Sequence, residues 1–79
     1  MRSITHATQI GAILGARRKS LNLSQTEVAS RLGLSQNRLS ELESRPDTLT
    51  VAQLLALLNA LGLEMTVAVQ AGAKTNTEW

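Results

Sequence analysis

The feature that most constrains the fold of this chain is a pair of short helical patterns, joined by a single glycine, in residues 23–44. The first pattern begins at Ser24, whose hydroxyl can accept from a free backbone N–H, and Glu27 can return that bond in a capping box. Gly33 then supplies the left-handed conformation that closes a helix. Because Ser35 starts the second pattern, only a sharp turn fits between the two predicted helices.

Small and apolar residues complete this helix pair. Helices that cross steeply through a short turn need a small residue where they touch, and Ala29 supplies it. Gln25 lies in the first turn. The buried faces carry Val28, Leu32, Leu34, Leu39 and Leu42. These positions resemble the helix-turn-helix of the lambda-repressor, Cro and Xre-type proteins. The resemblance implies an all-α, lambda-repressor-like bundle of four to five short helices, in which the second helix of the pair enters the major groove of DNA.

The outward face of that second helix predicts the base-reading residues. Each helical residue advances about 100° around the axis, so burying the two leucines turns the polar residues outward. Glutamine and asparagine can form paired bonds to adenine, and serine can serve several bases. We therefore predict base contacts from Ser35, Gln36, Asn37 and Ser40. Glu41 has two interpretations, since it could accept from a cytosine amino group or repel phosphate and so reduce non-specific binding.

Phosphate contacts are predicted from polar and basic residues around the same helices. They are Gln25, Arg31, Arg38 and Arg45. The formal net charge of +2 permits nucleic-acid binding but would not predict it alone. On an arbitrary helix such residues would merely be solvated, and each arginine taken alone would be ordinary surface. The caps, the glycine and the small residue in register favour DNA contact.

A first helix is expected from about His6 to Ser20, covering the helix pair. Gly11 and Gly15 lie inside it, and each costs about 1 kcal/mol relative to alanine in a helix interior. That cost suggests that some other backbone approaches closely at both positions.

A fourth helix is expected to begin at Thr50, with Gln53 completing another capping box, and to end at Gly62. Its predicted core residues are Leu54, Leu55, Leu58 and Leu61. The helix is apolar over more of its circumference than a small core requires, so some of these leucines alternatively line a dimer surface.

The periodicity changes after this helix, because Met65, Val67 and Val69 alternate with polar or small residues. We predict a β-strand over residues 64–70 that pairs with its own copy across a dimer two-fold axis, since an isolated strand cannot satisfy its backbone groups. A segment that is merely extended, or that continues as helix, is the alternative. The predicted organisation is a helix-turn-helix domain over 1–63, the dimerising strand over 64–70 and a flexible tail over 71–79. A two-fold dimer would set two recognition helices about 34 Å apart, matching a palindromic operator.

Several other functions find little support in the residues. The chain has no cysteine and one histidine, His6, and its six acidic residues show no metal-ligating arrangement, so we expect no enzyme activity, metal or cofactor. The apolar stretch from Val51 to Leu63 is too short to span a bilayer, and no signal peptide is recognised. A bacterial, cytoplasmic, nucleoid-associated protein without membrane contact is expected.

A narrower resemblance covers nearly the whole chain. The order of helices, the EMTVAVQ segment and the polar AGAKTNTEW tail resemble HipB-like antitoxins of HipA-type serine/threonine kinase toxins. This resemblance implies a homodimeric, operator-binding repressor that binds double-stranded DNA and a HipA-like kinase. Trp79, the sole Phe, Trp or Tyr residue, is the predicted anchor for that partner, and a tryptophan that ends the sequence by chance is the alternative. A free-standing phage-type repressor and a protein-interaction adapter without DNA contact remain as alternatives.

The repressor resemblance also implies one structural ion pair. In that family a buried arginine of the first helix pairs with the glutamate that ends the recognition helix, and these positions match Arg18 and Glu43. Glu43 is an acid near a helix C-terminus, where the helix dipole disfavours it, so a nearby cation is expected.

Overall fold

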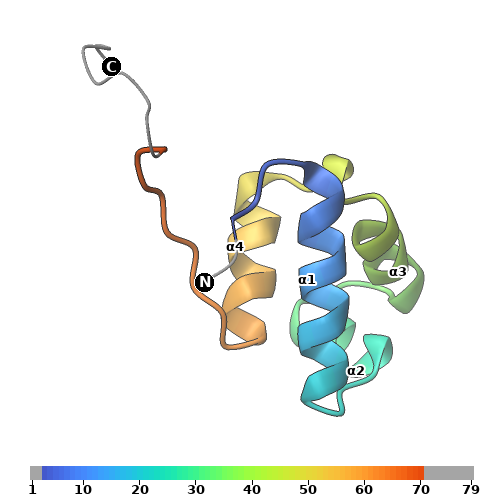
Figure 1. The fold of residues 1–79 in the computed structure, drawn as a ribbon. Coiled ribbons are helices and arrows are strands. Elements are labelled where there is room, and N and C mark those ends of the chain that lie inside the picture. Colours follow the sequence, from blue (N-terminus) through green and yellow to red (C-terminus); the bar gives the residue numbers. More distant parts are fainter. Residues whose placement is uncertain (1–2, 71–79) are drawn as a thin grey trace.

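The computed structural model describes residues 3–70, which form a bundle of short helices (Figure 1). The α-helices are α1 (Ala7–Ser20), α2 (Gln25–Arg31), α3 (Gln36–Ser44) and α4 (Val51–Ala60), and a 3-10 turn, η1 (Pro46–Thr48), follows α3. Helices α1 and α2 both pack against α3, and α4 lies on the other side of α1 from α3 (Figure 1). The predicted all-α, repressor-like bundle is confirmed.

The helix starts follow the predicted capping chemistry. The Ser24 hydroxyl accepts from the backbone N–H of Glu27 at 3.0 Å, and the Glu27 carboxylate accepts from the Ser24 backbone at 3.1 Å. Thr50 and Gln53 make the same reciprocal pair, both bonds being 3.0 Å. Each box satisfies two backbone donors that the first turn of a helix leaves without partners. The predicted starts of α2 and α4 are therefore confirmed.

Glycine closes α2 and α4 as predicted. Gly33 and Gly62 both adopt φ of 69°, the left-handed region that costs glycine nothing. After Gly33 the chain turns back toward α2, and the Leu34 N–H donates to the Ala29 carbonyl at 2.9 Å. Ala29 is 1% exposed, so the small residue lies inside the bundle beside the tight turn that sets α3 against α2.

The core joins all four helices, and one prediction about its membership is wrong. Its buried apolar residues are Leu14, Val28, Ala29, Leu39, Leu42, Leu57 and Leu61, with Leu54 at the margin. On α4 the buried stripe runs through positions 54, 57 and 61. Leu55, predicted as core, is 44% exposed, while Leu57, which was not predicted, is 1% exposed. Apolar residues cover so much of α4 that periodicity alone could not fix its orientation.

The two glycines of α1 differ in their surroundings. A Cβ at Gly11 would collide with the backbone carbonyl oxygen of Glu43 and lie 3.2 Å from Pro46, so the predicted approach of another backbone is confirmed there. At Gly15 the nearest atom is a carboxylate oxygen of Glu43 at 3.6 Å, an ordinary contact. The same prediction is wrong at Gly15, because α3 ends opposite the first glycine only.

Residues 63–70 leave α4 as a segment without regular secondary structure and run along the side of the bundle away from α3 (Figure 1). The predicted strand over residues 64–70 needs a second chain to pair with, so it stays a prediction. The predicted tail, 71–79, and the predicted anchor Trp79 lie outside the described residues. Within residues 3–70 no helix is long and apolar enough to cross a membrane.

Candidate DNA-binding interface

The candidate interface is the exposed side of α3 and the helix starts next to it. Leu39 and Leu42 are fully buried, which fixes the rotation of α3 against the core. Gln36 and Asn37 consequently stand exposed in its first turn. A polar helix end presented in this way has the shape of a major-groove reader.

The four predicted base-reading residues are not equally exposed to solvent. Ser35, Gln36 and Asn37 are consecutive and exposed at the start of α3, whereas Ser40 lies one turn later and is half-buried. The Ser35 hydroxyl accepts from the Arg38 backbone N–H at 3.1 Å and so caps the helix. Its O–H proton stays free to donate. The structure therefore brings three of the four together as one exposed group.

The predicted phosphate contacts lie at separate points around α3. Arg31 is the last residue of α2 and Arg45 directly follows α3, and both are exposed. Arg38 is half-buried within α3 and forms an ion pair with Glu41 one turn later. Glu41 therefore has a third role, as the partner of Arg38, beside the two interpretations of the sequence. An exposed pair of this kind contributes little to stability.

Arg18 and Glu43 form the ion pair that the family resemblance implies. Arg18 Nε lies 2.7 Å from Glu43 Oε2, Nη2 donates to Oε1 at 3.1 Å, and Nη1 donates to the Leu23 carbonyl at 3.0 Å. The side chains are 11% and 13% exposed. The hydrogen bond to Glu43 raises the pKa of Arg18, against the opposing effect of burial. A nearly buried charge is thus fully paired, and it ties α1 to the end of α3.

Gln25 has contacts that the sequence patterns did not reveal. Its amide Nε2 donates to Glu43 Oε1 at 3.1 Å, and its Oε1 accepts from Gln36 Nε2 at 2.6 Å. The predicted phosphate contact would have to use its remaining amide N–H. Gln25 lies 18 residues from Glu43 and 11 from Gln36, and only the packing of α2 across α3 brings them together.

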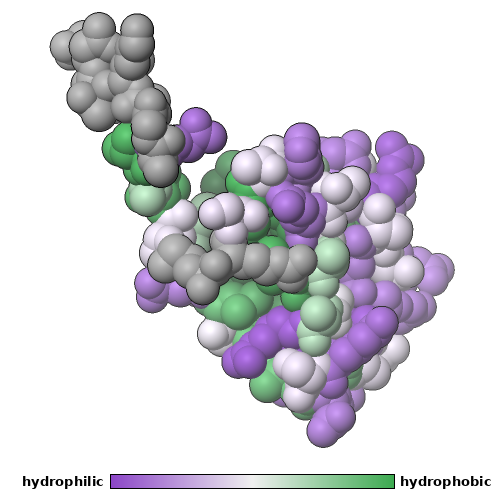
Figure 2. Space-filling view, viewed as in Figure 1, coloured by the Kyte–Doolittle hydropathy of each residue, from purple (hydrophilic) through white to green (hydrophobic). Residues whose placement is uncertain are grey.

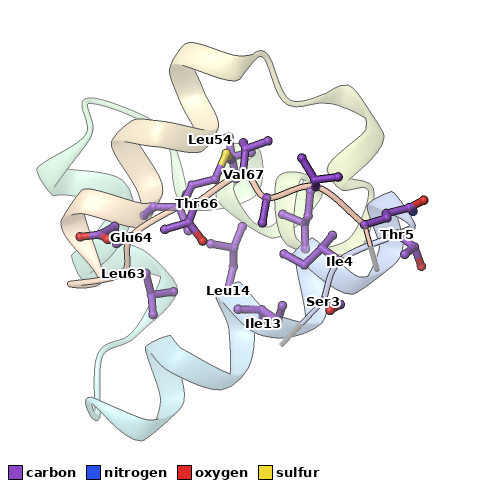
Figure 3. Close-up of a pocket in the computed structure, with 16 residues that line it drawn as sticks. Ser3, Ile4, Thr5, Ile13, Leu14, Leu54, Leu63, Glu64, Thr66 and Val67 are labelled. Carbon is purple, nitrogen blue, oxygen red and sulfur yellow. The ribbon is translucent and has the colours of Figure 1, made fainter. Parts of the chain in front are cut away.

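A second surface is apolar and lies away from α3. A groove runs between α1, α4 and the flanking segments, where Ile13 and Leu14 of α1 and Leu54 of α4 lie near Ile4 and Val67 (Figure 3). In Figure 2 hydrophobic residues gather over α4 and the segment after it, whereas hydrophilic residues cover the side of α2 and α3. The residues predicted to form the dimer, Met65, Val67 and Val69, are 44%, 93% and 72% exposed.

Within residues 3–70 the histidine, aspartate and glutamate side chains nowhere gather in a group of three that could hold a metal ion.

Comparison with known families decides the class of protein. A family model described as Helix-turn-helix matches residues 14–67, which is more than half of the chain. The chain belongs to the helix-turn-helix family. The match includes α2 and α3, so the polar surface described above lies on the helix pair from which this family takes its name.

Two characterised relatives resemble this helix-turn-helix protein in sequence. Antitoxin HipB of Escherichia coli K12 is 28% identical over 78 residues, which cover 91% of this chain and 89% of HipB. The ImmF control region 10 kDa protein of Bacillus phage phi105 is 37% identical over 54 residues, which cover 65% of this chain and 60% of the phage protein. The HipB-like resemblance extends over more of both chains.

Solved structures agree with the sequence comparison. A chain of the HipA-HipB-O2-O3 complex matches with a TM-score of 0.80 and 28% identity, covering 87% of this chain and 97% of that one. A chain of the HipB-O1-O2 complex gives the same TM-score and identity and is covered completely. The predicted resemblance to HipB-like antitoxins is confirmed.

Proposed function

We propose that this helix-turn-helix protein is a dimeric, sequence-specific DNA-binding repressor and the antitoxin of a HipA-type kinase operon that it regulates. One observation carries the proposal, namely the exposed group Ser35 to Asn37 at the start of α3, on a scaffold matching HipB chains with a TM-score of 0.80. Glutamine and asparagine there offer the donor and acceptor pairs that adenine requires in the major groove.

Basic residues support the same surface. Arg31 ends α2, shortly before the exposed group Ser35 to Asn37 in the chain, and Arg45 directly follows α3. Gln25 is hydrogen-bonded to Gln36, and Arg38 is the next residue after the exposed group. Contacts to phosphate fix the register of a protein on DNA, and base contacts supply the sequence preference. We assign the phosphate role to these four residues and base reading to Ser35, Gln36, Asn37 and Ser40.

The apolar groove supports a homodimer. Val67 and Val69 stand exposed beside apolar residues of α1 and α4, and burial against a second copy would remove that surface from water. We assign dimerisation to Met65, Val67 and Val69. A two-fold pair of recognition helices reads a palindromic operator. The solved relatives include the HipA-HipB-O2-O3 and HipB-O1-O2 complexes.

The partner proposal rests on the likeness to HipB. HipB occurs in a solved complex with HipA, so we assign this chain a HipA-like serine/threonine kinase partner, with Trp79 as an anchor and the bacterial cytoplasm as the place of action. Replacing Trp79 by alanine should weaken capture of the HipA-like kinase partner and leave DNA affinity unchanged. Equal kinase capture by both proteins would contradict the anchor role.

The phage relative supports a second candidate, a free-standing repressor that needs no kinase. The two candidates share the DNA reader and differ in the partner. A neighbouring reading frame that encodes a HipA-like kinase, and whose product copurifies with this chain, favours the antitoxin. A kinase that does not bind the protein favours the free-standing repressor.

The decisive test of DNA binding compares two duplexes of equal length and composition. One is the promoter region upstream of the protein's own gene, and the other is a scrambled version. Specific complexes are commonly bound about 10³-fold or more tightly than non-specific DNA. We expect a preference of that order, with affinity falling as salt rises because phosphate contacts release counterions. Equal affinity for both duplexes would overturn the proposal and favour a protein-interaction adapter without specific DNA contact.

A further inference from the structure

Four side chains form a continuous hydrogen-bonded series from the core to the reading surface. Arg18 donates to Glu43, Glu43 also accepts from Gln25, and Gln25 accepts from Gln36. The series begins at Arg18, whose side chain is 11% exposed, and ends at a glutamine on the outer face of α3. The geometry points to Glu43 as a positioning residue for base reading, an inference that rests on the proposed function.

The direction of each hydrogen bond in the series depends on which atoms can donate. A carboxylate paired with a guanidinium only accepts, whereas a glutamine amide has an accepting oxygen and a donating NH₂ group. The Gln25 group facing Glu43, at 3.1 Å, must therefore be its NH₂. The carbonyl oxygen of Gln25 then points to Gln36, and the 2.6 Å bond requires the NH₂ of Gln36 on that side. Each amide is fixed in one of its two orientations by its inner neighbour.

This polarity determines what Gln36 offers to a base. One N–H of Gln36 is engaged by Gln25, which leaves its carbonyl oxygen and its second N–H. In the major groove adenine displays an amino donor beside an accepting N7, whereas guanine displays two acceptors. One acceptor and one donor in fixed order match adenine and oppose the guanine O6. Glu43, whose side chain is 13% exposed, would thus select adenine over guanine through two intervening amides.

The test uses a variant that interrupts the series without disturbing the ion pair. Gln25→Met keeps the length of the side chain and leaves Arg18 and Glu43 in contact, but it can no longer fix Gln36. We expect the adenine-over-guanine preference at the base facing Gln36 to fall about 10-fold, which is within the range for one paired base contact. Selection from a randomised duplex library, followed by sequencing, measures this preference for each protein.

Glu43→Gln provides the second variant, since glutamine can present either an acceptor or a donor to Gln25. We expect the same loss of preference, and no further loss when Glu43→Gln is combined with Gln25→Met. The thermal midpoint shows whether Glu43→Gln remains folded; if it does not, Gln25→Met alone decides. Arg31→Met is the matched control, because that exposed arginine lies outside the series and should change affinity equally for all sequences.

A readout without DNA separates this inference from the proposed function. In the free protein the side-chain amide resonances of Gln36 should shift in Gln25→Met and stay unchanged in Arg31→Met. An unchanged Gln36 resonance, or an adenine preference that is retained while affinity falls equally for all sequences, would each overturn the positioning role. A wild-type protein without any sequence preference would instead overturn the proposed function, and this inference with it.

Discussion

The helix pair α2–α3 and the apolar surface of α1, α4 and residues 63–70 differ in where their partners lie. The first region has its partners within the same chain, since its caps and its turn are complete within the helix pair and Glu43 pairs with Arg18 of α1. The second leaves Val67 93% exposed and Leu55 44% exposed. The self-contained region is the one suited to a rigid reader of DNA, and the unsatisfied region is the one suited to a second copy of the chain.

The largest effect on stability is expected from a substitution at the contact between the two regions. Gly11→Ala would drive a Cβ into the Glu43 carbonyl and separate α1 from α3, so we expect a loss of about 1–3 kcal/mol in the free energy of unfolding. Gly15→Ala is the matched control. Its Cβ meets only a carboxylate oxygen at 3.6 Å, so the gain in helix propensity should stabilise by about 0.5–1 kcal/mol. Denaturant titration measures both, and effects of the same sign would contradict this packing.

Some features of the two regions are determined by local sequence and others by packing. The caps at Ser24 and Thr50 and the turn at Gly33 depend on residues within four positions, so the sequence predicted them. The exposure of Leu55 depends on how α4 rotates against α1. Hydrophobic periodicity does not determine that rotation, and the prediction of Leu55 as a core residue was wrong.

The interface shows the same division. The outward group at the start of α3 followed from burying Leu39 and Leu42, and the position of Arg18 opposite Glu43 came from family resemblance. The bridging role of Gln25 did not follow from either. It joins residues 11 and 18 positions away, and only the crossing of α2 over α3 places its amide between them.

Charges placed on one face of the predicted strand test whether the apolar surface forms the dimer. Val67→Asp with Val69→Asp should raise the dimer dissociation constant about 100-fold or more, because two carboxylates would replace apolar surface that the partner copy buries. Thr66→Asp with Ala68→Asp charges the alternate face and should leave the dimer intact. Sedimentation equilibrium at micromolar concentration measures both. A wild-type monomer, or equal effects of the two pairs, would contradict the strand.

The smallest expected effect lies in the cap of α2. Hydrogen bonds from Ser24, mainly from its backbone, lower the pKa of Glu27. The charged form is therefore favoured in the folded protein, so its stabilisation is complete above the ordinary glutamate pKa and is lost as the pH falls through the lowered value. Glu27→Gln keeps the capping geometry and should be slightly less stable than wild type at neutral pH only. A difference that persists in acid would contradict this origin.

The central claim is that the exposed group at the start of α3 reads DNA sequence. The most direct measurement compares wild type with the double variant Gln36→Ala and Asn37→Ala on the upstream promoter duplex and on its scrambled control. We predict that the variant keeps its thermal midpoint and its dimer, keeps its weak affinity for the scrambled duplex, and loses the preference for the promoter. An unchanged preference in the folded double variant would contradict the account.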